Sequence, residues 1–169
     1  MKIVIIGSGR VGAVLAEAYD SAGHDVIILD VSARAFDRLP AEFHGTAIRG
    51  DGTDEDSLLR AGVADADAFL ALTEGDNRNV MACQVATEKF GITNVIAKIN
   101  DPVRAAAYAD LGLAVLCRTT MQAEAVTTYL GLGSLGTPGV TAPTGTHHGG
   151  DRHDPLAESV DAGAAGQGA

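Results

Sequence analysis

The stretch KIVIIGSGRVGAVLAEAYD, residues 2–20, runs from a strand-like segment through a glycine-rich turn into a helical segment. The continuous aliphatic run is typical of a parallel strand that is covered on both faces. The glycines follow the spacing G-x-G-x-x-G: Gly7 permits a tight turn, Gly9 lets a phosphate approach the backbone, and Gly12 lets the helix pack close to the strand. Free N–H groups at such a helix start attract a pyrophosphate, so this segment is predicted to bind one. The predicted phosphate-binding residues are Gly7, Ser8, Gly9, Arg10, Val11 and Gly12.

A second strand, predicted at residues 25–30, ends on the acidic residue Asp30. An acid about 20 residues after the glycines, at the end of a strand, is the context that strengthens a dinucleotide-binding interpretation. The Asp30 carboxylate is expected to accept hydrogen bonds from the adenosine ribose hydroxyls and to repel a 2′-phosphate, which disfavours NADP. The alternative is an ordinary glycine turn with Asp30 as a solvated strand end.

The alternation of strand and helix continues to about residue 130. Strands are predicted at residues 2–6, 25–30, 46–50, 68–72, 94–98 and 114–117. Helical segments are predicted at residues 10–23, 32–39, 54–62, 75–91, 101–112 and 119–131, with Asp101 as an N-cap and Pro102 in the first helical position. Six strands joined by helical crossovers predict an α/β fold, a Rossmann-like doubly wound parallel sheet with strand order 3-2-1-4-5-6.

The composition changes after Tyr129. Residues 131–169 are rich in Gly, Ala, Thr and Pro and contain few large apolar residues, so we expect one domain at residues 1–130 and a disordered tail at 131–169. His147, His148 and His153 within that tail suggest a metal site. A solvated polar tract is the favoured interpretation, because no framework fixes the ligands, and no metal is predicted.

The composition excludes several classes of partner. The chain has a net charge of −10 and no basic stripe, which argues against nucleic acid. No apolar run approaches the roughly 20 residues that cross a bilayer, so no direct membrane insertion is expected. Cys83 and Cys117 lie in apolar contexts and are expected to be buried, reduced thiols, which fits a cytoplasmic protein.

Further polar residues stand where predicted strands end. Asp51 and Gly52 follow the third strand, Thr73 follows the fourth, and Lys98 ends the fifth. In open α/β sheets, ligands bind in the crevice outside these carboxyl ends. Asp51 alone could be a turn or cap residue and Lys98 a surface lysine, but their agreement across several strands favours a shared site.

Three longer segments add to this pattern: GDGTDEDSLLRAGV (50–63), DADAFLALTEGDNRN (65–79) and NVIAKINDPVRAAAYADLG (94–112). Together with GSGRVG and Asp30 they resemble the nucleotide-binding regulatory subunits of Trk- and Ktr-type potassium uptake systems. The resemblance covers about residues 1–130, and the shared unit is the N-terminal lobe of the RCK domain, which regulates K⁺ conductance.

The resemblance implies a cytosolic regulatory subunit that binds NAD(H) or ATP/ADP. Such subunits form homodimers that assemble into rings beneath a membrane potassium channel subunit, and the nucleotide changes ring shape and channel opening. The resemblance places residues 7–12, Asp30, Asp51, Gly52, Thr73 and Lys98 in the site, with Arg10 reaching the phosphates.

The sequence departs from the family pattern in three places. Thr119 and Thr120 stand near the position of a proline and an acid that can help hold a divalent ion, so that metal site is not expected. Lys98 stands where arginine is common, which removes bidentate contacts. The second RCK lobe is absent from this sequence, and ligands of that lobe are not expected to bind.

No catalytic constellation accompanies the nucleotide site. No Tyr-x-x-x-Lys pair, Ser-His-Asp set or substrate domain occurs, so binding without chemistry is predicted and no catalytic residue is assigned. The alternatives are a small NAD-dependent oxidoreductase and a nucleotide-binding interaction module without a channel partner.

The last predicted helix carries an apolar stripe that either covers the chain's own sheet or forms a subunit interface. The stripe consists of Met121, Ala125, Val126, Tyr129 and Leu130.

Overall fold

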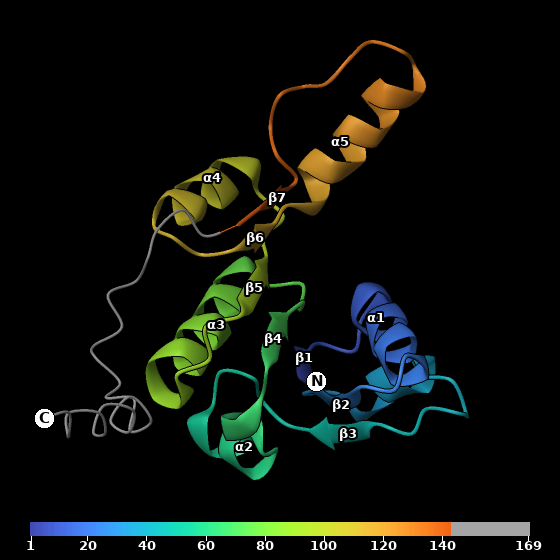
Figure 1. Cartoon of the computed structure of the whole chain (residues 1–169), viewed down its shortest axis with the longest axis vertical. Coiled ribbons are helices and arrows are strands. Elements are labelled where there is room, and N and C mark those ends of the chain that lie inside the picture. The colour runs from blue at the N-terminus through green and yellow to red at the C-terminus, as the bar shows by residue number, and fades with distance from the viewer. Residues whose placement is uncertain (143–169) are drawn as a thin grey trace, which may run out of the picture.

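A seven-stranded sheet forms the centre of the computed structural model, which describes residues 1–142 (Figure 1). Its strands lie in the order β3-β2-β1-β4-β5-β6-β7, and the first six of them run parallel. The strands are β1 (Lys2–Ile6), β2 (Asp25–Asp30), β3 (Thr46–Arg49), β4 (Ala68–Ala71), β5 (Val95–Lys98), β6 (Val115–Leu116) and β7 (Val140–Thr141). The predicted Rossmann-like fold and the order 3-2-1-4-5-6 are confirmed, and β7 is an addition.

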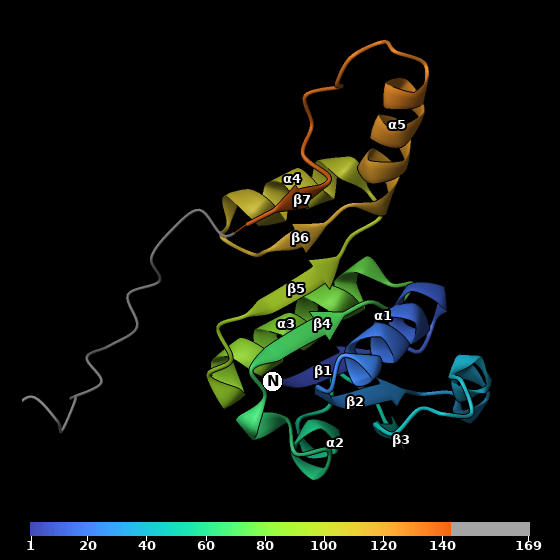
Figure 2. The ribbon, with the colours of Figure 1, turned by 45° about the vertical axis from the view of Figure 1, so that its right-hand side comes forward.

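Helices cover both faces of this sheet (Figure 2). They are α1 (Arg10–Ser21), α2 (Glu55–Arg60), α3 (Asp76–Phe90), α4 (Pro102–Asp110) and α5 (Arg118–Tyr129), with the 3₁₀ helices η1 (Ala33–Arg38) and η2 (Val63–Asp65). Successive side chains of β1 point to opposite faces, and both sets are buried. Ile3 and Ile5 pack on the face of α1 and η1, whereas Val4 and Ile6 pack on the face of α2 and α3. The doubly covered parallel sheet therefore explains the continuous aliphatic strands.

The N-cap predicted for the segment after β5 is present. Asp101 accepts hydrogen bonds from the backbone N–H groups of Val103 at 2.8 Å and Arg104 at 3.1 Å, and Pro102 occupies the first position of α4. The two cysteines are also buried as predicted, and neither forms a disulfide. Burial raises the pKa of the Cys83 thiol to about 12, so this side chain is neutral at physiological pH and packs as a small apolar group.

The segment after α5 returns to the sheet. β7 pairs antiparallel with β6, and the Cys117 N–H donates to the Gly139 carbonyl at 2.7 Å. The prediction of a disordered tail from residue 131 does not hold for this strand, because the open edge of β6 offers backbone groups that a returning strand satisfies without large apolar side chains. For residues 143–169 disorder stays a prediction, since they lie outside the described residues together with His147, His148 and His153.

Helix α5 projects away from the body of the molecule (Figures 1 and 2). Its apolar side chains remain exposed, with Tyr129 at 89% and Val126 and Leu130 at 59% of their full accessibility. The interpretation that this stripe covers the chain's own sheet is therefore wrong. In the part of the chain that the structure describes, no helix combines the length and apolar character needed to span a bilayer.

Candidate functional site

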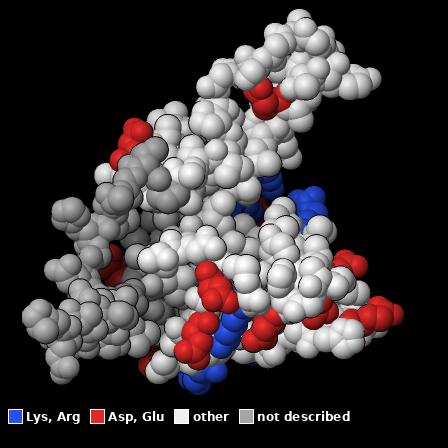
Figure 3. All heavy atoms as spheres, viewed as in Figure 1, with Lys and Arg blue, Asp and Glu red and all other residues white. Residues whose placement is uncertain are grey.

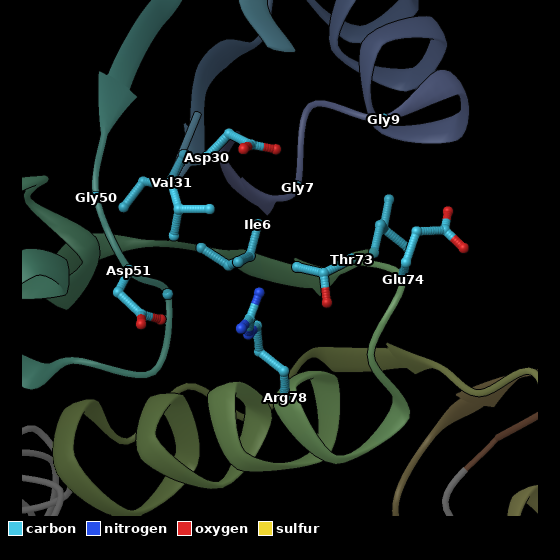
Figure 4. A pocket seen from close by; sticks show the side chains of 13 residues that line it. Ile6, Gly7, Gly9, Asp30, Val31, Gly50, Asp51, Thr73, Glu74 and Arg78 are labelled. Atoms are coloured by element: carbon cyan, nitrogen blue, oxygen red, sulfur yellow. The ribbon is translucent and has the colours of Figure 1, made fainter. Parts of the chain in front are cut away.

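A pocket opens at the carboxyl edge of the sheet, where β1 is flanked by β2 and β4 and the crossovers leave to opposite faces (Figure 4). Its empty volume, which includes solvent at its open side, is about 560 Å³. It is lined by Ile6, Gly7, Gly9, Leu29, Asp30, Val31, Gly50, Asp51, Gly52, Leu72, Thr73, Glu74 and Arg78. Edges of this kind are where open α/β sheets bind ligands.

The glycine turn behaves as its spacing predicts. Gly7 has φ +101°, a conformation that favours glycine, and a Cβ on it would lie 3.0 Å from the Thr73 nitrogen. A Cβ on Gly12 would lie 2.0 Å from the Gly7 carbonyl oxygen, so this glycine lets α1 approach the turn. Gly9 precedes α1, and a Cβ on it would meet no atom within 4 Å. Gly7 and Gly12 therefore serve the fold, and the bare side of Gly9 faces open space.

Asp30 fastens this turn to the end of β2. One carboxylate oxygen accepts from the Ser8 N–H at 2.9 Å, and the other accepts from the Ser32 N–H at 2.9 Å. Ser8 is fully buried, and its hydroxyl donates to the Ala35 carbonyl at 3.1 Å. The sequence did not indicate this structural use of Asp30. Each carboxylate oxygen has a further lone pair, so ribose hydroxyls remain possible donors.

Asp51 and Gly52 shape the opposite side of the pocket. Asp51 accepts from the Thr53 N–H at 3.0 Å and from its hydroxyl at 2.8 Å, so the turn role considered for this residue is real. A Cβ on Gly52 would lie 2.2 Å from Ile6 Cγ2, which shows how closely this turn approaches β1. Both residues nevertheless line the pocket.

Asn79, a residue that sequence reasoning missed, holds the ends of β4 and β5 together. Its side chain is fully buried and satisfied by four contacts. The amide oxygen accepts from the Thr73 N–H at 2.9 Å and hydroxyl at 2.7 Å, and the amide nitrogen donates to the carbonyls of Thr73 at 2.9 Å and Lys98 at 2.7 Å. Asn79 lies on the same helix face as the buried residues Cys83 and Ala86. A polar side chain on that apolar stripe was the available signal.

Lys98 is a buried lysine and not the surface residue considered as an alternative. It is 1% exposed, and its ammonium donates to a Glu74 carboxylate oxygen at 3.1 Å. The second Glu74 oxygen lies 4.0 Å from Arg118. The hydrogen bond from Lys98, followed by the charges of Lys98, Arg118 and Arg10, holds the pKa of Glu74 below its usual value. Glu74 and Arg118 were not predicted to belong to the site.

Arg78, also missed, extends from the first turn of α3 into the pocket (Figure 4). Among residues 1–142, no carboxylate lies within ion-pair distance of its guanidinium.

Two other predicted residues, Arg10 and Val11, are exposed at the start of α1 and do not line the pocket. Ser8 and Gly12 lie buried behind the turn. Within the described residues no group of three or more His, Cys, Asp or Glu side chains is arranged to hold a metal ion.

Comparison with known proteins places this fold and site in a family. The TrkA-N domain family model matches residues 3–118. The chain belongs to the TrkA-N domain family. This confirms the resemblance drawn from the glycine turn, Asp30 and the three longer segments. As a TrkA-N domain, the chain is 44% identical over 124 residues to the Trk system potassium uptake protein TrkA of Streptomyces coelicolor, covering 73% of this chain and 56% of that protein.

A second TrkA-N relative is the Trk system potassium uptake protein TrkA homolog of Pyrococcus abyssi. It is 37% identical over 102 residues, which cover 60% of this chain and 45% of that protein. The chain thus spans about half the length of these curated relatives. Their names describe potassium uptake and not an enzymatic reaction.

Solved structures share the TrkA-N fold. The TrkA-N domain of inner membrane protein ybaL from Escherichia coli superposes with a TM-score of 0.65 at 20% identity, covering 78% of this chain and 95% of that one. The Kef C-terminal domain of Shewanella denitrificans, in AMP-bound form, gives 0.64 at 22% identity and covers 80% and 84%. The GsuK RCK domain gives 0.60 at 21% identity and covers 77% and 28%. At these identities the likeness concerns the fold.

Proposed function

We propose that this chain is the nucleotide-binding domain of a regulatory subunit in a potassium uptake system. The observation that carries the proposal is one pocket that joins the glycine turn, at Gly7 and Gly9, to Asp30 in a TrkA-N domain. Relatives named for Trk potassium uptake support the transport role. The proposed ligand is NAD(H) or ATP/ADP, and the chain itself performs no chemistry on it.

The proposed placement of the nucleotide follows the polarity of the pocket. The phosphates lie beside Gly9, where the N–H groups of α1 are unpaired and Arg10 stands at the first helical position. The ribose lies against the Asp30 carboxylate. The planar guanidinium of Arg78 lies across the pocket from Asp30, where it can stack on an adenine ring (Figure 4). This arrangement uses the remaining acceptor capacity of Asp30 and the charge of Arg78, which has no ion-pair partner among residues 1–142.

Replacing Asp30 by alanine is expected to weaken adenine-nucleotide binding by about 1.5–3 kcal/mol, because the ribose loses a charged acceptor. Isothermal titration calorimetry with NADH, NAD, ATP and ADP measures the loss. Asp56→Ala on α2 is the matched control, because Asp56 is exposed and lies outside the pocket. Urea denaturation of both variants measures how much stability is lost with the hydrogen bond between the Ser8 N–H and Asp30. A loss of affinity that exceeds this loss of stability is then assigned to the ribose contact. Unchanged affinity for all four nucleotides would rule out the assignment of Asp30.

We further propose that a second copy of this chain covers the exposed stripe of α5. Exposed apolar side chains gathered on one helix are typical of an interaction surface. Such homodimers would assemble into a ring beneath a membrane potassium channel subunit, at the inner face of the cell membrane. Copurification of such a subunit with the tagged chain tests the partner.

The nucleotide can act on this assembly only if two assembly states bind it differently. We expect small-angle scattering of the oligomer to differ between ATP and ADP, and Arg10→Ala to reduce that difference, because Arg10 stands where phosphate charge changes. Val126→Asp, which places a charge on the exposed α5 stripe, is expected to give a monomer. The proposal is contradicted if the wild-type chain is monomeric at tens of micromolar, or if its scattering profile is the same with ATP and with ADP.

A further inference from the structure

Three basic side chains from three different elements surround one acidic side chain at the edge of the pocket. Glu74, in the loop after β4, pairs with Lys98 of β5 at 3.1 Å and lies 4.0 Å from Arg118 of α5. Arg10 of α1 is near enough to lower the pKa of the same carboxyl group. Basic side chains gather in the hollow beneath α5 (Figure 3). Glu74 therefore neutralises a cationic cluster that the fold assembles.

The two partners of the central ion pair differ greatly in freedom. The Lys98 side chain is 2% exposed, whereas the Glu74 side chain is 75% exposed. A buried ammonium requires a charged or polar partner, and within residues 1–142 Glu74 is the one carboxylate at ion-pair distance. The Glu74 side chain can rotate into solvent at little cost in free energy, whereas the buried Lys98 side chain cannot. Another anion can therefore take the place of Glu74 beside Lys98.

The position of Glu74 identifies the anion. Glu74 lines the pocket on the side of Gly9, the residue that precedes α1, and Asp51 lies on the other side (Figure 4). The phosphates are proposed to bind at the start of α1, on the same side of the pocket as Glu74. A phosphate bound there would compete with Glu74 for the cations that Glu74 holds. Glu74 is ionised at neutral pH, as an ordinary glutamate is, and Lys98 lowers its pKa further, so the competition is between two anions.

We propose that Glu74 is a specificity-determining residue that makes nucleotide affinity depend on phosphate charge, by occupying Lys98 and Arg118 until a phosphate displaces it. This inference rests on the proposed nucleotide site and deepens it. Adenosine carries no phosphate and leaves the ion pairs in place. ADP and ATP must displace Glu74 or bind beside its negative charge, and both routes reduce their affinity.

Glu74→Gln tests the inference, because the amide oxygen still accepts from Lys98 while the negative charge is removed. The affinity for ADP and ATP is expected to rise about tenfold, and the affinity for adenosine is expected to stay within about twofold. Calorimetry of the full chain with adenosine, AMP, ADP and ATP at low salt measures these values. Glu88→Gln is the matched control, because Glu88 is exposed on α3 and lies outside the pocket.

A second measurement uses inorganic pyrophosphate, which carries the charge without the adenosine. It is expected to raise the melting temperature of Glu74→Gln more than that of the wild-type chain. Equal changes for adenosine and ADP, or equal stabilisation by pyrophosphate, overturn the role of Glu74 and leave the nucleotide site standing. Absence of adenosine, AMP, ADP and ATP binding in both proteins overturns the proposed function and this inference together.

Discussion

Asn79→Ala is expected to lower the free energy of unfolding by about 3 kcal/mol, measured by urea denaturation. The side chain is fully buried and makes four hydrogen bonds to Thr73 and Lys98. Its removal leaves buried backbone groups at the ends of β4 and β5 without partners, and each such group costs about 1–3 kcal/mol. The cavity left by the lost amide adds to the cost.

Asn94→Ala is the matched control for this prediction. Asn94 immediately precedes β5 and is exposed, so its replacement is expected to change the free energy of unfolding by no more than about 0.5 kcal/mol. If both variants were equally stable, the network around Asn79 would not hold the strand ends together. The prediction is independent of any ligand, since it concerns contacts within the chain.

Much of the fold was predictable because its signals are local. The bounds of β1 and β2 match the predicted residues, and α4 begins where Asp101 and Pro102 indicate a helix start. The segment 33–38 was predicted as helical and is a 3₁₀ helix. A six-residue sequence without a side-chain cap does not distinguish an α-helix from a 3₁₀ helix. Short strands such as β6 were predicted one or two residues too long, because strand ends depend on pairing with neighbours.

The missed features all depend on contacts between distant segments. β7 forms because the edge of β6 is open, and the amino-acid composition of residues 131–142 does not indicate that such an edge is available. Glu74 reaches the site through Lys98 and Arg118, which lie 24 and 44 residues further along the chain. Arg78 enters the pocket because the first turn of α3 faces it, and nothing in the sequence distinguishes this arginine from a surface one. A glycine pattern, in contrast, carries its geometry in its spacing.

Gly12→Ala is expected to lower the free energy of unfolding by about 2–3 kcal/mol. Its Cβ would lie 2.0 Å from the Gly7 carbonyl oxygen. The oxygen belongs to the backbone and the backbone fixes the position of the Cβ, so no side-chain rotation separates the two atoms. Alanine improves helix propensity by about 1 kcal/mol in a helix interior, so a stabilised variant would be expected if the space were open. The clash is expected to dominate, because relieving it moves α1 away from the turn that it packs against. Urea denaturation measures the difference.

Gly9→Ala is the matched comparison, and the two glycines separate folding from binding. Gly9 has φ −76°, which any residue adopts, and its Cβ would meet no atom within 4 Å. Stability is therefore expected to fall by no more than about 1 kcal/mol, the cost of alanine at an N-cap. The new methyl group nevertheless stands where a pyrophosphate is proposed to approach α1, so nucleotide affinity in calorimetry is expected to fall at least about tenfold. Retained affinity in a stable Gly9→Ala chain would mean that the phosphates bind elsewhere. A loss of stability equal to that of Gly12→Ala would mean that Gly9, too, serves the fold and not the ligand.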